Sequence, residues 1–210
     1  MGDTESEPHE LHPHVLGIGG TMRSNSVSER ALRIALAAAA ARGATTSILT
    51  AADLRLPPYA YGLSDKIPSA RRLVSELARA DGIILSSPGY HGVLSGLIKN
   101  ALDYAEDLRD ADSPYLEGRA VGCIACAAGW QATTTTLMSL RMVVHALRGW
   151  PTPFGVIVNS ARSWEEQSAE PGDNSLHQQL ARVGQQVVWF ALLRHHVNHT
   201  EGSAVLYGRA

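Results

Sequence analysis

Hydrophobic residues along the chain alternate between short continuous runs and longer stretches in which they recur every three or four positions. The continuous runs predict buried strands, and the periodic stretches predict amphipathic helices. The runs lie at about 14–19, 45–51, 81–88, 120–127 and 154–158. The helical stretches lie at about 28–42, 69–80, 95–108, 133–149 and 174–194.

Five strands that alternate with five helices predict a parallel sheet joined by right-handed crossovers. The simplest arrangement is an α/β, flavodoxin-like, doubly wound five-stranded parallel sheet with strand order 2-1-3-4-5 and helices on both faces. In such a sheet, ligands bind outside the carboxyl ends of the strands, where the strand order reverses. The loops at 19–27, 88–96 and 128–133 are expected to meet at that point.

The chain has 210 residues, enough for one sizeable core, and we expect a single domain over 14–194. Residues 1–13 are acidic and polar and lack the apolar region of a signal peptide, so we expect a disordered leader. Residues 195–210 are expected to form a loose tail. The apolar runs are too short to span a membrane, and the net charge of −2 offers no basic surface for nucleic acid. These features predict a cytoplasmic protein without membrane or nucleic-acid partners.

Two cysteines, Cys123 and Cys126, form a C-x-x-C pattern inside a strand-like apolar run. Side chains three positions apart on a strand point to opposite faces, so we expect buried structural thiols rather than a redox pair. Histidines gather in both terminal segments without partner cysteines or a carboxylate cluster, which predicts solvated termini and no metal site. These histidines are His9, His12, His14, His195, His196 and His199.

The stretch 15–28 joins the first strand to the first helix through two glycines and a polar run. Small hydroxyl donors at a helix N-terminus form a cradle for a phosphate, and an arginine adds a charged donor. The loop has no GxGxxG, no GxxxxGK[ST] and no lysine, so it suits a single phosphate monoester such as that of FMN. An ordinary polar turn between strand and helix is the alternative. The polar residues of the loop are Thr21, Arg23, Ser24, Asn25, Ser26 and Ser28.

The loop after the third strand, at 86–96, carries features suited to a flat ring. Tyr90 can place an aromatic edge against a planar ligand, and Gly92 and Gly96 allow close approach of the backbone. Backbone N–H groups over 90–93 can bond the carbonyl and nitrogen edge of such a ring and stabilise its anionic reduced form. The loop at 128–130 adds an alanine, a glycine and a tryptophan on the far side of the same pocket.

The segments GGTMRSNS and SPGYHGVLSGLIKNALDY resemble the NADPH-dependent FMN reductase family, whose pattern is GSxRxxS and then roughly SPEYNGSxPGxLKNALD. The match spans about 15–158. The resemblance implies a flavodoxin-like fold, non-covalent FMN, NAD(P)H as hydride donor, and homodimers or tetramers. By position, it implies phosphate contacts from Thr21, Arg23, Ser26 and Ser28, and ring contacts from Pro88, Tyr90, His91, Gly92 and Val93, with Gly129 and Trp130 in the third flavin loop. It also places Asp53 and Pro57 near the flavin rim.

This chain departs from the family pattern at Gly89, His91 and Ser95, where glutamate, asparagine and proline are usual. The lost glutamate puts bracing of the loop or of a subunit contact in question. His91 brings a titratable group to the flavin, where its protonated form would raise the reduction potential. The alternative is that only its backbone meets the ring. Lys99, Asn100 and Asp103 are expected to be helix scaffolding.

No side chain stands out as a general acid, base or nucleophile. Hydride transfer from nicotinamide C4 to flavin N5 depends on alignment and needs no protein group to carry the hydride. We expect an NAD(P)H-dependent FMN oxidoreductase that supplies reduced flavin to a partner monooxygenase or reduces a second small-molecule acceptor. The alternatives are an FMN-retaining quinone, azo or metal reductase, a flavodoxin-type electron carrier, and a module that has lost flavin. The near-neutral net charge argues against a carrier.

The helix at 133–149 carries more apolar surface than one sheet face requires. Besides an inward stripe, it has Met138, Met142 and Val143, and Trp150 follows its end. Surplus apolar surface marks a partner site, and a symmetric dimer is the commonest outcome. We therefore expect a homodimer that uses this helix together with the one at 95–108. The inward stripe consists of Leu137, Leu140, Val144 and Leu147.

Overall fold

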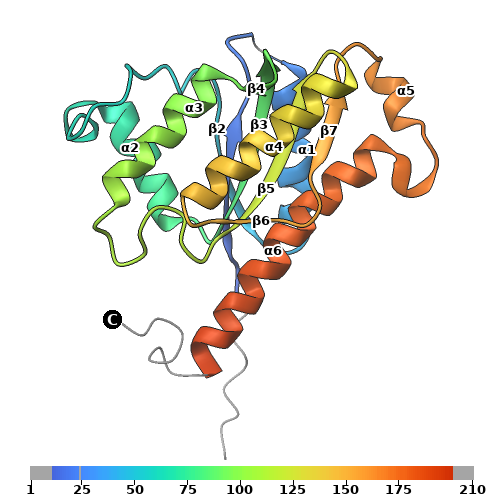
Figure 1. The fold of residues 1–210 in the computed structure, drawn as a ribbon. Coiled ribbons are helices and arrows are strands. Elements are labelled where there is room, and N and C mark those ends of the chain that lie inside the picture. Colours follow the sequence, from blue (N-terminus) through green and yellow to red (C-terminus); the bar gives the residue numbers. More distant parts are fainter. Residues whose placement is uncertain (1–10, 24, 201–210) are drawn as a thin grey trace, which may run out of the picture.

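The computed structural model describes residues 11–23 and 25–200, and a single sheet forms its centre (Figure 1). Four parallel strands make the body of the sheet in the order β2-β1-β3-β5; β6 and β7 extend it along β5, and β4 pairs antiparallel with β3. The strands are β1 His14–Gly19, β2 Thr45–Leu49, β3 Gly82–Tyr90, β4 Val93–Leu94, β5 Ala120–Ala127, β6 Trp150–Pro151 and β7 Val156–Asn159. The predicted strand order is confirmed, with β5 as its fourth strand and the β6–β7 edge as its fifth.

The edge of the sheet is less regular than predicted, because the strand expected at 154–158 forms as β7 and a further short strand, β6, precedes it. Strand β6 pairs with the start of β5, and β7 pairs with its end. Pro153 lies between the two pieces. Proline has no N–H to donate to a ladder and is confined to such edge positions.

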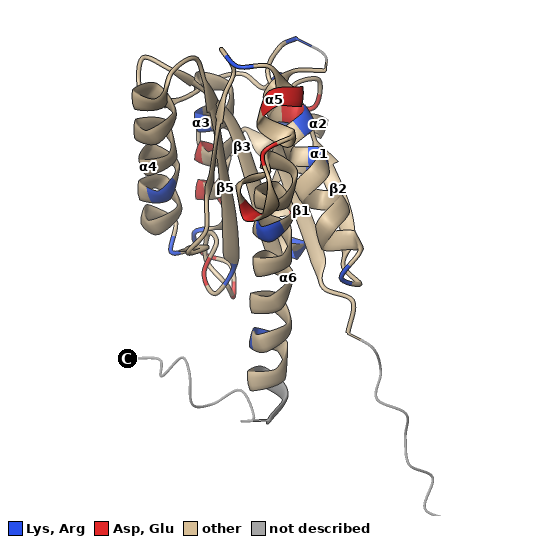
Figure 2. Ribbon diagram, turned by 90° about the vertical axis from the view of Figure 1, so that its right-hand side faces the viewer, with Lys and Arg blue, Asp and Glu red and all other residues tan. Residues whose placement is uncertain are grey.

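Helices cover both faces of the sheet (Figure 2). Helices α1 and α6 pack on one face, and α2, α3 and α4 pack on the other. The helices are α1 Val27–Ala40, α2 Pro68–Arg79, α3 Gly96–Asp103, α4 Trp130–Ala146, α5 Trp164–Ser168 and α6 Leu176–Thr200, with short 3-10 turns η1 Ser64–Lys66, η2 Tyr104–Leu108 and η3 Gly172–Asn174. None of the helices in the described part of the chain is long and apolar enough to cross a membrane.

The two helices on the first face approach each other closely through small residues. Gly184 of α6 lies so near α1 that a Cβ at this position would be 2.0 Å from the carbonyl oxygen of Ala35. That atom belongs to the backbone and cannot rotate away. The contact holds α1, and with it the loop before α1, against the rest of the domain.

The two cysteines lie on opposite faces of β5, as predicted. Cys123 belongs to the core under α2, α3 and α4, whereas Cys126 belongs to the core under α1 and α6. Both are free thiols. Burial raises the pKa of each thiol to about 12, so neither is a thiolate at neutral pH.

The ends of the domain differ from the prediction. Helix α6 continues to Thr200, beyond the expected start of a loose tail, and the Nε2 atom of His195 lies 3.0 Å from Oδ1 of Asp81. At the other end, the carbonyl of Pro13 accepts a hydrogen bond from the Thr45 N–H at 3.0 Å, so the last residues of the expected leader join the fold. The predictions for 1–10 and 201–210 lie outside the described residues.

Candidate functional site

Three loops meet at the carboxyl end of the sheet, after β1, β3 and β5. They enclose a cavity of about 530 Å³, within the size range of small-ligand sites. This cavity, called the first cavity below, is lined by Thr21, Arg23, Asn25, Ser26, Val27, Ser28, Pro88, Gly89, Tyr90, Cys126, Ala127, Ala128 and Ser160. The convergence predicted from the strand order therefore occurs.

The loop after β1 ends in a capped helix. Ser26 is the N-cap of α1, and its hydroxyl accepts a hydrogen bond from the Glu29 N–H at 3.3 Å. The Ser28 hydroxyl lies 3.2 Å from that of Ser26. The Thr21 hydroxyl accepts from the Arg23 N–H at 3.1 Å, which tightens the loop. The result is a hydroxyl-lined concavity over the positive end of the α1 dipole.

The loop after β3 is a β-hairpin, not the irregular loop expected from the sequence. Strand β3 runs on to Tyr90 and pairs with Val93 of β4. The two residues between them, His91 and Gly92, both have positive φ, at 54° and 85°. Such a pair forms the two-residue hairpin turn in which asparagine or aspartate followed by glycine is favoured, and histidine also tolerates this conformation. The turn therefore accepts histidine in the place of the family's asparagine.

The structure also accounts for the glycine at position 89. A Cβ on Gly89 would lie 2.3 Å from Oγ1 of Thr136, a buried residue of α4. That same hydroxyl donates to the carbonyl of Val93 at 3.5 Å. Helix α4 therefore packs directly on the hairpin and occupies the space that a glutamate side chain at position 89 would need.

The third departure from the family pattern, Ser95, is an N-cap. Its hydroxyl accepts from the Ile98 N–H at 3.3 Å at the start of α3. Its own N–H donates to the hydroxyl of Ser87 at 3.0 Å. Proline could make neither contact, so serine fixes the exit of the hairpin by hydrogen bonds.

The loop after β5 is very short, because α4 begins at Trp130, three residues earlier than predicted. Gly129 is the N-cap of α4, with a φ of 95° and open space where a Cβ would stand. The Oδ1 atom of Asn159, at the end of β7, accepts from the N–H groups of Gly129 at 3.1 Å and Ala161 at 3.0 Å. One buried amide thus joins the loops after β5 and β7.

Asn159→Ala is expected to loosen both loops, because it leaves two N–H groups without their acceptor at a cost of about 2 kcal/mol. Hydrogen–deuterium exchange should become faster at 128–131 and 160–162 while the rest of the sheet is unchanged. Asn174→Ala, in the exposed turn η3, is the matched control. Unchanged exchange in the Asn159 variant would show that the amide does not hold the loops.

A second cavity of about 620 Å³ borders the first and shares Ala128 with it. It lies between the hairpin turn and the start of α4. Tyr90 and Trp130, which belong to the two cavities, are each about half exposed, at 55% and 52%. The second cavity is lined by His91, Gly92, Ala128, Gly129, Trp130, Gln131, Ala132 and Thr135.

Comparison with known proteins gives this geometry its context. The model of the NADPH-dependent FMN reductase family matches residues 13–163. The chain belongs to this family. It is therefore an oxidoreductase with FMN as its cofactor and NAD(P)H as its electron donor.

Individual relatives agree with the family match. The chain is 27% identical over 153 residues to an NAD(P)H-dependent FMN reductase of Pseudomonas aeruginosa, covering 71% of this chain and 79% of that protein. It is 29% identical over 143 residues to an iron-sulfur flavoprotein of Methanocaldococcus jannaschii, covering 63% and 73%. The apo structure of NADH:FMN oxidoreductase (EMOB) has the same fold, with a TM-score of 0.61 at 21% identity, over 86% of this chain and 89% of that one.

The resemblance to the FMN reductases implies eleven residues in contact with the phosphate or the ring or in the third flavin loop, and ten of them line one of the two cavities. Six of them line the first cavity, namely Thr21, Arg23, Ser26, Ser28, Pro88 and Tyr90, and four line the second, namely His91, Gly92, Gly129 and Trp130. Val93 lines neither: its side chain is 51% exposed on the outer strand of the hairpin. Strand pairing with Tyr90 fixes Val93 there, because β4 is the antiparallel partner of β3.

Asp53 and Pro57, expected near the flavin rim, line neither cavity. The Asp53 carboxylate accepts from the Thr50 N–H at 2.9 Å and pairs with Arg72 at 2.7 Å. The Pro57 carbonyl accepts from the Asn100 side chain at 2.9 Å. Asn100 is thus scaffolding, as predicted, and so is the Lys99–Asp103 pair on the surface of α3.

Sequence reasoning missed Ser160 in the first cavity and Asn159 behind it. Asn159 is the last residue of β7 and Ser160 follows it, and a polar pair at the carboxyl end of a strand is itself a signal. The stretch 160–175, which has no regular hydrophobic pattern, contains α5, whose capping box joins Ser163 and Glu166. The S-x-x-E spacing is the sequence signature of such a helix start.

Within the described residues, no group of three or more His, Cys, Asp or Glu side chains is placed to hold a metal ion. Cys126 lines the first cavity, but its buried thiol, with a pKa raised to about 12, is no nucleophile. The chemistry of the site is that of hydrogen-bond donors and apolar surfaces.

Proposed function

We propose that this protein transfers a hydride from NAD(P)H to FMN bound in the first and second cavities, and passes the electrons to a second acceptor. The observation that carries this proposal is the hydroxyl-lined N-terminus of α1, which opens into the same cavity as the β3–β4 hairpin. A donor set of hydroxyls, helix N–H groups and one arginine suits a phosphate monoester. The residues present therefore fit FMN.

The chain's own residues divide between the two ends of such a ligand. Thr21, Arg23, Ser26 and Ser28 would hold the phosphate. Tyr90 and Trp130 would flank the ring, and the backbone of the hairpin turn would offer N–H donors to its polar edge. Gly129 supports this arrangement because its missing side chain leaves the start of α4 open to a flat ligand.

The cofactor supplies the chemistry of accepting a hydride from nicotinamide C4 at its N5 atom. The protein would bind FMN, orient its ring for hydride transfer and keep the polar edge of the ring in contact with the fixed N–H dipoles of the hairpin turn. No side chain in the two cavities is required as a proton carrier. We therefore propose that the site residues act by binding alone.

The final acceptor depends on whether the flavin stays bound. The two candidates are a reductase that releases reduced FMN to a partner monooxygenase and one that retains FMN and reduces a quinone, azo compound or metal ion. Gel filtration of the FMN-loaded protein, followed by NADPH and NADH oxidation with and without added FMN, separates them. A yellow protein that needs no added FMN indicates retention; oxidation only with added FMN indicates release; no oxidation at all contradicts the proposal.

Iron–sulfur chemistry, suggested by one relative's name, does not transfer to this chain. A cluster takes about four cysteine thiolates. The chain has two cysteines, and they are buried on opposite faces of β5. A flavodoxin-type carrier is the other alternative, and NAD(P)H oxidation distinguishes it from an enzyme.

We also propose that the protein is located in the cytoplasm. We further propose that it forms a homodimer through α4. Met138 and Met142 are exposed by 52% and 69% on the face of α4 away from the sheet, and Trp150 by 59%. Light scattering at micromolar concentration should give the dimer mass, and Met142→Glu should shift it towards the monomer. A monomer mass for the unaltered protein would rule the dimer out.

A further inference from the structure

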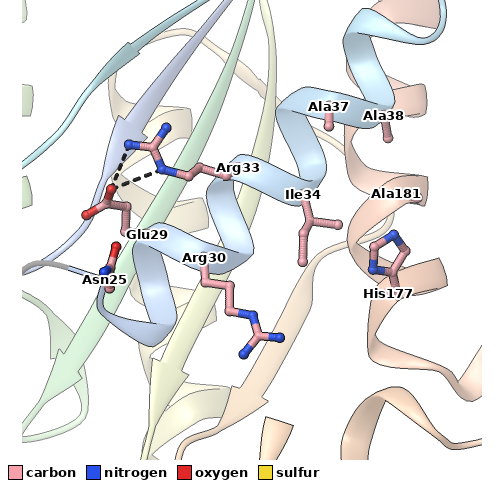
Figure 3. A pocket seen from close by; sticks show the side chains of 9 residues that line it. All are labelled: Asn25, Glu29, Arg30, Arg33, Ile34, Ala37, Ala38, His177 and Ala181. Carbon is pink, nitrogen blue, oxygen red and sulfur yellow. Dashed lines mark hydrogen bonds and ion pairs between the residues drawn. The ribbon is translucent and has the colours of Figure 1, made fainter. Parts of the chain in front are cut away.

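A third cavity, of about 670 Å³, lies outside the residues assigned to FMN, between helices α1 and α6 (Figure 3). It shares only Asn25 with the first cavity and no residue with the second, so it adjoins the phosphate loop and is separate from the proposed ring site. A cavity of this size can hold a small ligand. We call it the α1–α6 groove.

The floor of the groove is apolar and follows α1. Ile34, Ala37 and Ala38 of α1 line it, and Ala181 of α6 lies opposite them (Figure 3). Beyond Ile34 the floor consists of methyl groups alone, so no large side chain divides it. From Arg30 to Ala38 the helix rises about 12 Å, which gives the floor an elongated shape.

The two helices also limit the width of the groove. One helical turn after Ala181, a Cβ on Gly184 would stand 2.0 Å from the carbonyl oxygen of Ala35, so the backbones of α1 and α6 nearly touch there. The groove therefore narrows beside this contact. An unbranched alkyl chain that lies along α1 fits such a floor better than a wide ring system does.

One cationic side chain stands at the end of the groove next to the phosphate loop. The Cζ atom of Arg30 lies 4.2 Å from the centroid of the Trp164 ring, and this stacking holds the guanidinium in place. Its ion pair with Glu165 is long, at 4.0 Å, and the side chain of Glu165 is 79% exposed. An ion pair this exposed contributes little, so the guanidinium is available to a ligand.

The charge of the groove suits a head group with one negative charge. Arg33 donates through Nε and Nη2 to Oε1 of Glu29 at 3.0 and 2.7 Å, so these two charges cancel (Figure 3). Arg30 then leaves a single positive charge over, and His177 adds a polar ring from α6. A planar guanidinium matches a carboxylate through two parallel hydrogen bonds. A phosphate monoester, with nearly two negative charges, would have Arg30 alone to balance it.

We infer that the α1–α6 groove binds a small amphipathic carboxylate, an unbranched alkyl chain with one carboxylate head, beside the flavin site. The carboxylate pairs with Arg30, and the chain lies over Ile34, Ala37 and Ala38. This ligand and FMN bind at the same time, because the groove shares only Asn25 with the two flavin cavities. The inference goes beyond the proposed function and holds whichever acceptor the flavin reduces.

The first test measures the binding of hexanoate and octanoate to the FMN-loaded protein by calorimetry. Burying one CH₂ group contributes about 0.8 kcal/mol, which is about fourfold in Kd. Each added CH₂ group should therefore tighten binding about two- to fourfold, because a chain in an open groove is only partly buried. Octanol, which lacks the charge, and octylamine, which has the opposite charge, should bind at least tenfold more weakly than octanoate.

Two variants change the ends of the groove independently. Arg30→Glu reverses the charge and should weaken hexanoate and octanoate at least tenfold. Ala38→Phe fills the far end of the floor and should weaken octanoate more than hexanoate. Both positions are at least partly exposed and line neither flavin cavity, so Tm and FMN affinity should stay the same. Arg71→Glu, on α2 across the sheet, is the matched control and should bind octanoate as the unaltered protein does.

Three results would overturn the inference. The first is that octanoate does not bind the unaltered protein, or binds no better than octanol. The second is that either groove variant binds octanoate as the unaltered protein does. The third is competition between octanoate and FMN, which would place the carboxylate in the flavin site instead of the groove.

Discussion

Gly184→Ala is expected to destabilise the protein by about 3 kcal/mol, because the new methyl group would stand 2.0 Å from the Ala35 carbonyl oxygen. The substitution would otherwise favour the helix, since alanine is a better helix former than glycine by about 1 kcal/mol. The clash outweighs this gain and makes the substitution destabilising, because the opposing atom belongs to the backbone and can move only if α1 and α6 separate. In a chain of this size, the loss corresponds to a fall in Tm of roughly 6–12 °C.

Gly96→Ala is the matched control for this prediction. Gly96 opens α3, and no atom lies within 4 Å of the place where its Cβ would stand. This variant should keep its Tm within about 2 °C or gain slightly. A Gly184 variant as stable as the Gly96 variant would contradict the close approach of α1 and α6.

Arg23→Ala is expected to weaken FMN binding tenfold or more. A charge-assisted hydrogen bond to a phosphate contributes about 1.5–3 kcal/mol, and about 1.4 kcal/mol corresponds to a factor of ten in Kd. Riboflavin has the same ring without the phosphate, so its affinity should hardly change. Fluorescence titration of the flavin-free protein with each ligand measures both constants.

Arg71→Ala, on the opposite face of the sheet, serves as the control and should leave both affinities unchanged. Three results are informative. A selective loss for FMN places Arg23 at the phosphate, and equal loss for FMN and riboflavin removes it from that position. No loss for either ligand would leave Arg23 outside the flavin site.

The body of the fold could be predicted from the sequence because its strands are continuous apolar runs. The run 120–127 became β5 with the same ends, since buried parallel strands are apolar on both faces. The sheet edge could not be predicted so well. At 150–159, Pro151, Thr152, Pro153 and Gly155 interrupt the apolar pattern, and tertiary contacts with β5 determine where pairing resumes.

The candidate site shows the same division between local and tertiary information. The start of α1 was predictable because Ser26 caps a strongly helical stretch. The β3–β4 hairpin was not, because its turn is His91-Gly92 rather than the more recognisable Asn-Gly. The close packing of Thr136 on Gly89 joins residues 47 positions apart, so no local pattern could reveal it.

His91 remains the position where a property of the flavin could depend on this chain in particular. His91 lines the second cavity, and its backbone forms part of the hairpin turn. Asparagine also accepts a positive φ, so His91→Asn should keep the turn. If the imidazole affects the reduction potential of the flavin, the variant should lose an inflection in the plot of that potential against pH. Superimposable plots for the two proteins would show that His91 contributes only to the hairpin turn.

NAD(P)H is expected to reduce FMN held at the carboxyl end of this sheet. The most direct test of this expectation is to load the protein with one equivalent of FMN, remove oxygen, add NADPH or NADH, and record the absorbance spectrum over time. The yellow flavin absorbance should be lost, with one nicotinamide oxidised per FMN, and the change should be much slower at the same ligand concentrations in the Arg23→Ala variant. A flavin spectrum that is unchanged by both donors in the FMN-loaded protein would contradict this expectation.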